Sequence, residues 1–176
     1  MNETLPNPYY HQLDAIADAY TPLLLILALA CVARLWWQQR WALACVWRTV
    51  ASVLWVAFVS YGGMALDKTL NIWPKWQMDY STHTAVAGGL TILITALLFT
   101  ARHINLVKGV KSKWEVIAAL AVAVISACYF ALMVYQQYHS FADIFTTFVV
   151  TGTLQYWGLT TFLPPLSRSA HKRAAL

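Results

Sequence analysis

Long apolar stretches follow one another along this chain of 176 residues and constrain its fold more than any other feature. We place five of them, at Thr21–Trp37, Trp41–Leu66, Thr84–Ala101, Trp114–Tyr135 and Ser140–Leu163. A helix needs about 20 apolar residues to cross the roughly 30 Å hydrocarbon layer of a bilayer. Backbone that faces lipid must satisfy its own hydrogen bonds, so each stretch is predicted to be helical. The sequence therefore predicts an all-α integral membrane protein with five transmembrane helices in a compact antiparallel bundle.

The composition supports this assignment and limits the number of domains. Hydrophobic residues make up 60% of the chain and charged residues 11%, whereas an ordinary soluble domain carries about 25% charged residues. A chain of this length forms one domain. We assign residues 21–163 to a membrane domain and residues 164–176 to a basic cytoplasmic tail. Residues 1–20 form an extracytoplasmic segment that could hold a short interfacial helix near His11–Tyr20.

The distribution of charge sets the expected orientation of the bundle. If the N-terminus lies outside, ten of the twelve Lys and Arg residues fall at the inner side, and only Lys68 and Lys75 fall outside. Six of the seven acidic residues fall outside, the exception being Glu115. Cytoplasmic loops carry an excess of Lys and Arg, so we predict an outer N-terminus and an inner C-terminus. The net charge of +5 is then a topology signal and not a sign of nucleic-acid binding.

Ionisable side chains collect at the outer ends of the predicted helices. His83 opens the third apolar stretch, while His139 and Asp143 lie at the start of the fifth. Such groups at the mouth of apolar helices indicate a functional site. His139 and Asp143 are four residues apart, which places them on one face of a helix. A carboxylate bonded to one ring nitrogen fixes the histidine tautomer and leaves the other nitrogen free to attack.

The same outer face offers groups that suit an anion. Ser81 and Thr82 precede His83 at a helix N-terminus, where unpaired N–H groups and the helix dipole favour a phosphate. Lys68 and Lys75 lie in the loop before it and complete a plausible anion cradle. Each feature also has a simpler interpretation. Ser81 alone is a typical helix cap, the two lysines alone are ordinary loop charges, and a His-x-x-x-Asp pair alone is a local ion pair.

The motifs at these positions resemble those of the type 2 phosphatidic acid phosphatase superfamily. Its Ser-Gly-His-Thr/Ala motif is similar to Ser81-Thr82-His83-Thr84-Ala85, and its His-x-x-x-Asp-Val motif is similar to His139-Ser-Phe-Ala-Asp143-Ile144. Lys68 and Lys75 have the spacing of its first motif, in which an Arg stands at the position of Lys75. The family's later Ser-Arg pair falls on Leu132 and Met133. The resemblance covers about Lys68–Ile144.

The resemblance implies a role for each of these residues. His139 would be the nucleophile on phosphorus, Asp143 would orient it, and His83 would protonate the leaving oxygen. The phosphoryl oxygens would be held by Ser81, Thr82, Lys68 and Lys75. No metal or other cofactor is required for this chemistry. The expected function is a lipid phosphatase that hydrolyses a phospholipid or polyprenyl (di)phosphate at the outer membrane face through a phosphohistidine.

Three other functions remain open at this point. The first is a head-group phosphotransferase with the same two histidines and aspartate, as in the sphingomyelin synthase branch that lacks the arginines. The second is a metal-dependent membrane hydrolase, because two histidines and a carboxylate can also hold Zn²⁺ or Fe²⁺. The third is a non-enzymatic membrane scaffold. The expected partners are a phosphorylated lipid and the bilayer, and the expected location is a bacterial inner membrane with the site facing the periplasm or exterior.

Overall fold

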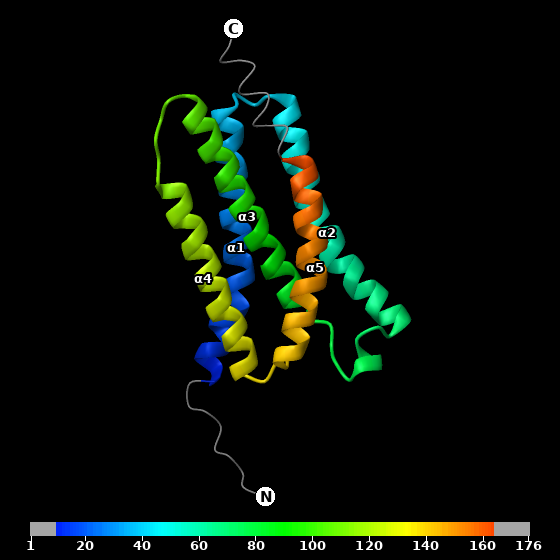
Figure 1. Cartoon of the computed structure of the whole chain (residues 1–176). Coiled ribbons are helices and arrows are strands. Elements are labelled where there is room, and N and C mark those ends of the chain that lie inside the picture. The colour runs from blue at the N-terminus through cyan, green and yellow to red at the C-terminus, as the bar shows by residue number, and fades with distance from the viewer. Residues whose placement is uncertain (1–9, 164–176) are drawn as a thin grey trace, which may run out of the picture.

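The computed structural model describes residues 10–163, which form five long α-helices and one short 3₁₀ helix. They are α1 (Tyr10–Gln38), α2 (Leu43–Leu70), η1 (Pro74–Trp76), α3 (Thr82–Val107), α4 (Trp114–Tyr135) and α5 (Phe141–Phe162). Successive helices run in opposite directions through one bundle (Figure 1). α3 packs against each of the other four, so it forms the centre. The predicted all-α bundle of five helices is confirmed.

Four of the five helices, α1 to α4, are long and apolar enough to cross a membrane. The prediction of an integral membrane protein is confirmed with four candidate spans, α1 to α4. α5 is also 22 residues long, but it is less apolar and does not belong to this group. The reason lies in its composition, because Asp143, Gln155 and six threonines interrupt its apolar residues. That α5 also spans the membrane stays a prediction.

Most polar side chains of α5 nevertheless form hydrogen bonds within the bundle. The Gln155 Nε2 donates to Ser60 Oγ at 3.0 Å and to the Ala85 carbonyl at 3.1 Å. Gly89 makes room for this amide, because a Cβ there would overlap it. Five threonine hydroxyls donate to carbonyls one turn earlier, namely those of Thr146, Thr151, Thr153, Thr160 and Thr161. Because each of these hydroxyls donates to a carbonyl of its own helix, it can lie in an apolar environment without an unsatisfied donor.

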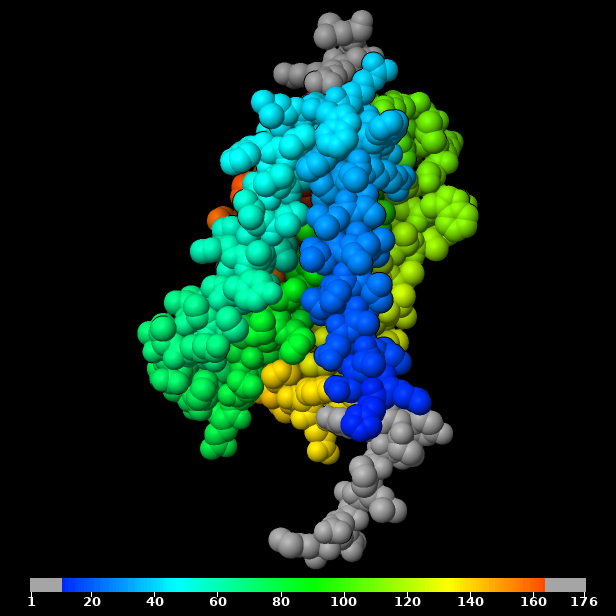
Figure 2. All heavy atoms as spheres, turned by 180° about the vertical axis from the view of Figure 1, so that it is seen from behind, coloured from blue at the N-terminus to red at the C-terminus, as the bar shows by residue number. Residues whose placement is uncertain are grey.

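α1 begins earlier than the predicted first span. It runs without a break from Tyr10, so residues 11–20 continue the spanning helix and do not form a separate interfacial helix. Its 29 residues correspond to about 43 Å, more than the roughly 30 Å of hydrocarbon. α1 covers the back of the bundle from end to end (Figure 2). The basic tail assigned to residues 164–176 lies outside the described residues.

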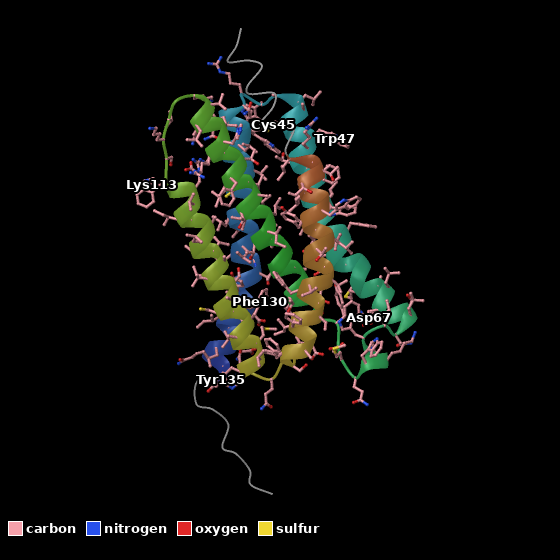
Figure 3. The ribbon with its side chains drawn as sticks, viewed as in Figure 1. Cys45, Trp47, Asp67, Lys113, Phe130 and Tyr135 are labelled. Atoms are coloured by element: carbon pink, nitrogen blue, oxygen red, sulfur yellow. The ribbon has the colours of Figure 1, made fainter. Side chains whose placement is uncertain are left out.

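The two ends of the bundle differ in their side chains. Figure 3 shows Lys113 and Trp47 at one end, and Asp67 and Tyr135 at the other. At the first end, Arg34 Nη2 donates to Glu115 Oε1 at 2.6 Å. Glu115, the one acidic residue predicted to lie on the inner side, is therefore paired with Arg34, one of the basic residues predicted there. The other end carries both polar segments that the sequence analysis selected.

Candidate active site

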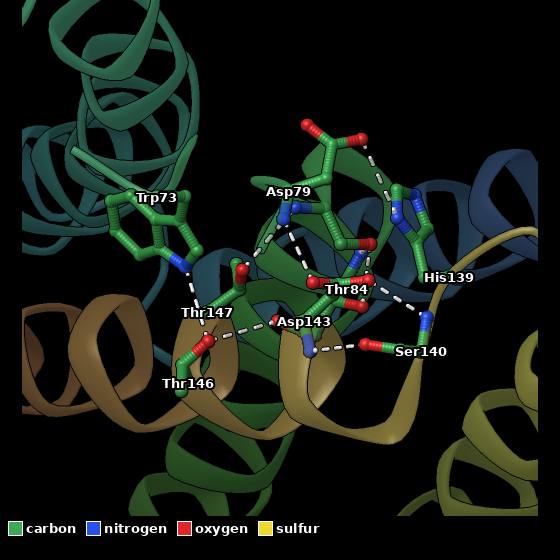
Figure 4. Close-up of polar contacts among 9 residues, drawn as sticks. Trp73, Asp79, Thr84, His139, Ser140, Asp143, Thr146 and Thr147 are labelled. Carbon is green, nitrogen blue, oxygen red and sulfur yellow. Dashed lines mark hydrogen bonds and ion pairs between the residues drawn. The ribbon is translucent and has the colours of Figure 1, made fainter. Parts of the chain in front are cut away.

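Asp143 joins the loop before α3 to the first turn of α5 (Figure 4). One carboxylate oxygen accepts the backbone N–H of Asp79 at 2.8 Å, and the other accepts that of Ser140 at 2.7 Å. The Ser140 hydroxyl accepts the Asp143 N–H at 3.2 Å, which completes a capping box. The N-terminus of α5 is thereby fixed beside the segment that enters α3.

The N-terminus of α3 is fixed by Ser81. Its hydroxyl oxygen accepts the backbone N–H of Thr84 at 3.2 Å and lies 2.8 Å from the Thr84 hydroxyl. Its own backbone N–H donates to Thr147 Oγ1 of α5 at 3.2 Å. Ser81 is fully buried, so the interpretation as a helix cap is confirmed. Its contact with a phosphoryl oxygen stays a prediction.

Two buried aromatic residues hold the loop between α2 and α3. The Trp73 backbone N–H donates to Asp67 Oδ1 at 2.8 Å, and its indole N–H donates to Thr146 Oγ1 at 3.1 Å. The Tyr80 hydroxyl donates to the Ser60 carbonyl at 2.7 Å, and burial raises the pKa of this phenol to about 12. The Tyr80 ring also packs edge-on against Trp73. The loop is therefore anchored to α2 and α5 on either side of Asp79.

His139 lies in the short connection between α4 and α5, one residue before the cap of α5. Its side chain is only 13% exposed, and its Nδ1 lies 3.8 Å from Asp79 Oδ2. That distance is too long for a hydrogen bond, and among residues 10–163 Nδ1 has no hydrogen-bond partner. Asp79 is therefore the carboxylate in ion-pair range of the imidazole. The Asp143 carboxylate accepts the backbone N–H groups of Asp79 and Ser140.

Burial lowers the pKa of His139 below its ordinary value of 6.5. The charges of Asp79 and Asp143 oppose this shift, and that of His83 adds to it. The net direction leaves the imidazole uncharged at neutral pH, which is the form that can attack an electrophile.

The remaining predicted residues divide into two groups. His83 and Thr82 lie in the first turn of α3 and line a pocket between α1, α2 and α3. Lys68 lies in the last turn of α2 and Lys75 in η1, and both are exposed. Among the described residues, neither lysine forms an ion pair with a carboxylate. The structure thus joins the segments of Ser81, His139 and Asp143 directly, while the lysines stay at the periphery.

Sequence reasoning missed Asp79 as a site residue, although its carboxylate lies in ion-pair range of His139. Its position in an irregular loop carries no periodic signal, and its link to His139 spans 60 residues of chain. The capping box could have been read from Ser140-Phe-Ala-Asp143, which has the spacing of that motif. Within residues 10–163, no group of three or more His, Cys, Asp or Glu side chains could hold a metal ion. Comparison with known protein families, curated proteins and solved structures found no match for this chain.

The pairing of His139 with Asp79 predicts a specific pH profile. If His139 is a catalytic nucleophile, we expect the kcat/KM of the wild type to fall as pH drops through the lowered pKa of His139, with the acidic limb below pH 6.5. Asp79→Asn removes a charge that raises this pKa, so the limb moves to still lower pH. We expect the plateau to fall about tenfold, short of the roughly 10⁴-fold that loss of a buried orienting aspartate costs a serine protease.

Asp143→Asn is the contrasting variant for that experiment. It disturbs the acceptors of two backbone N–H groups, so we expect it to lower the thermal stability of the outer loops as well as activity. Asp79→Asn should leave stability unchanged, because the backbone N–H of residue 79 still donates to Asp143. An unmoved acidic limb in Asp79→Asn would show that Asp79 does not act on His139.

Proposed function

We propose that this protein is a membrane phosphatase that removes phosphate from a phosphorylated lipid at its outer face, with a covalent phosphohistidine as intermediate. The observation that carries the proposal is the uncharged, mostly buried imidazole of His139, with Asp79 at 3.8 Å, beside the capped N-terminus of α5. The N-terminus of α3 is tied to the same point through Asp143 and Ser81. Such N-termini stabilise anions.

In the first step, His139 Nε2 attacks phosphorus while its Nδ1–H points to the carboxylate of Asp79. The bond between phosphorus and the leaving oxygen breaks, and protonated His83 donates its proton to that oxygen. Asp79 favours the tautomer with the proton on Nδ1 and stabilises the positive charge that develops on the ring. Asp143 was expected to orient the nucleophile. In this scheme it does so indirectly, because it holds the backbone of Asp79, which faces His139.

In the second step, a water molecule attacks the phosphorus of the phosphohistidine. Its proton passes to His83, now neutral, and the phosphorus–nitrogen bond breaks to release phosphate and restore His139. Backbone N–H groups at the first turn of α3, with Lys68 and Lys75 closing over the substrate, would stabilise the phosphoryl oxygens. Stabilisation of this kind is usually the largest catalytic contribution.

A head-group phosphotransferase is the second candidate. The type 2 phosphatidic acid phosphatase superfamily, which this sequence resembles, has a Ser-Arg pair at the positions of Leu132 and Met133. Here Met133 is buried and Leu132 packs against the core. A bidentate arginine clamp on phosphate is therefore not available from these positions. An alcohol in place of water would resolve the same phosphohistidine and pass the phosphoryl group on.

We further propose that α5 also crosses the bilayer, with the N-terminus outside and the C-terminus inside, in a bacterial inner membrane. The charge bias supports this orientation, since Lys68 and Lys75 are the two basic residues on the outer side. A membrane-impermeant thiol reagent should not label Lys108→Cys in intact cells, whereas Lys75→Cys should be labelled. Labelling of Lys108→Cys without permeabilisation would place the site on the wrong side of the membrane.

Phosphate release from a panel of lipid phosphates, with and without a strong chelator, tests the proposed function. We expect release to continue in chelator and to stop with vanadate, which mimics the transition state of phosphoryl transfer. Transfer of phosphate to an added lipid alcohol would favour the phosphotransferase. Activity that is lost in chelator and restored by zinc alone would make the histidines metal ligands, and a complete lack of turnover would favour a scaffold.

A further inference from the structure

A polar pocket of about 270 Å³ lies between the outer ends of α1, α2 and α3. Its polar lining consists of Asp18 and Thr21 from α1, Tyr61 from α2, and Thr82 and His83 from α3. A water molecule takes up only about 30 Å³ of liquid, so the pocket has room for a larger group. It is also the pocket that contains His83, the residue assigned to the leaving oxygen.

The early start of α1 creates this pocket. Asp18 and Thr21 lie in outer turns of the helix, and α1 packs closely along α3. Asp18 would have faced water as part of a separate N-terminal segment, but in the structure it lines the same pocket as Thr82 and His83 from the first turn of α3. No ion pair joins Asp18 to another residue within the range 10–163, and the carboxylate remains exposed.

The chemistry of the lining selects the kind of group that fits. An ionised carboxylate only accepts hydrogen bonds, and the hydroxyls of Thr21, Tyr61 and Thr82 can both donate and accept. None of the described lining residues is Lys or Arg, so the side of the pocket formed by Asp18, away from His83, does not favour an anion. A neutral group with hydroxyls of its own would satisfy both the carboxylate and the hydroxyls.

We propose that this pocket binds an alcohol with at least two hydroxyl groups, one that bonds to phosphorus beside His83 and one that donates a hydrogen bond to Asp18. The inference rests on the proposed function for the reacting group: the alcohol is the one that leaves phosphorus. By microscopic reversibility, an acceptor alcohol that attacks the phosphohistidine would use the same pocket. Asp18, Thr21 and Tyr61 thus become binding residues.

This assignment discriminates between lipid classes. A polyprenyl alcohol has no second hydroxyl, so it would leave Asp18 and its neighbours without a partner and would be bound less well. Hydrolysis of a polyprenyl diphosphate at the outer phosphate releases a prenyl monophosphate, whose negative charge Asp18 repels. A monoacylglycerol or a sphingoid base meets both requirements, whereas a diacylglycerol does not, because its two other hydroxyls are esterified.

Equilibrium binding to the full-length protein in detergent micelles tests the pocket without any turnover. The probes are a radiolabelled monoacylglycerol and the 3-hydroxypropyl ester of the same fatty acid, which lacks the middle hydroxyl. We expect the wild type to bind the monoacylglycerol about tenfold more tightly, as a hydrogen bond to a charged group implies. Asp18→Ala should abolish this preference, and Asp18→Asn, which keeps an uncharged acceptor, should retain part of it.

Asp14→Ala is the matched control, because Asp14 lies one turn earlier on α1 and does not line the pocket. It should keep the full preference. Equal affinity of the wild type for the two probes would overturn the proposal. So would an equal loss of preference in Asp14→Ala and Asp18→Ala, since that would point to a general effect on α1.

A second measurement follows the fate of the phosphohistidine. With nitrophenyl phosphate as donor and glycerol as acceptor, the ratio of glycerol phosphate to inorganic phosphate should fall in Asp18→Ala and keep its wild-type value in Asp14→Ala. An unchanged ratio in Asp18→Ala would mean that Asp18 does not act on the alcohol, which would overturn the proposal. If no donor is turned over, the proposed function fails. The binding preference of the wild type for the monoacylglycerol still shows whether the pocket binds an alcohol with two hydroxyl groups.

Discussion

We expect His139→Ala to reduce phosphate release to background and to eliminate the covalent phosphoenzyme. In the proposed mechanism the imidazole supplies the nitrogen that bonds to phosphorus, so no phosphohistidine can form without it. A loss of about 10⁴-fold or more is the expected scale for removal of a nucleophile. Release of phosphate from a lipid phosphate and labelling by a radioactive substrate are the two measurements.

His103→Ala is the matched control for this variant. His103 is an exposed histidine of α3 near the opposite end of the bundle, so its loss should leave both measurements unchanged. His139→Ala must also insert and remain monodisperse in detergent. Because His139 forms no hydrogen bond through Nδ1 among residues 10–163, its removal leaves no partner unsatisfied there. Wild-type turnover in a stable His139→Ala variant would place the nucleophile elsewhere.

His83→Ala slows the chemical step by about 10²–10⁴-fold, the range typical of general acid catalysis. The reason is that the alkoxide of a lipid alcohol is a strong base and leaves poorly without a proton. The loss should shrink for nitrophenyl phosphate, whose leaving group is a weak base and needs no proton. Comparison of kcat for the two substrates in the wild type and the variant measures this difference directly.

The same comparison separates the two histidines. His139→Ala should gain nothing from a better leaving group, because the missing atom is the one that attacks. If nitrophenyl phosphate instead rescues His139→Ala and not His83→Ala, the two roles are exchanged. An equal loss of activity in His83→Ala for both substrates would mean that His83 holds the phosphate and does not protonate the leaving oxygen.

The fold was largely predictable, because the lengths of the apolar stretches determine where the long helices lie. α4 has the predicted bounds, α3 extends beyond them at both ends, and α2 begins at Leu43 in place of Trp41 and ends at Leu70 in place of Leu66. α1 was placed too late, since Asp14 and Asp18 made its first turns look too polar for a helix that continues into the membrane. α5 was predicted from the apolar stretch Ser140–Leu163, and its threonines lower its hydropathy without preventing a helix, because their hydroxyls bond to the helix backbone.

The site was predictable only where its residues are close in sequence. The caps at Ser81 and Ser140 depend on neighbours three residues away, which a sequence displays directly. The pairing of Asp79 with His139, and of Asp18 with the pocket of His83, depends on how three helices and a loop pack. Spacing along the chain carries no information about such contacts. It instead suggested Asp143 as the partner of His139, although α5 begins only at Phe141 and the Asp143 carboxylate caps its N-terminus.

The most direct test of the account is the chemical identity of the phosphoenzyme. The purified protein would be mixed with a radiolabelled lipid phosphate, quenched within the first turnover, digested, and analysed for the modified residue. We predict one phosphate on His139, in a linkage that is labile in acid and stable in base, as expected for phosphorus bonded to nitrogen. Phosphate on a serine, threonine or aspartate, or no covalent phosphate under conditions where turnover proceeds, would contradict the account.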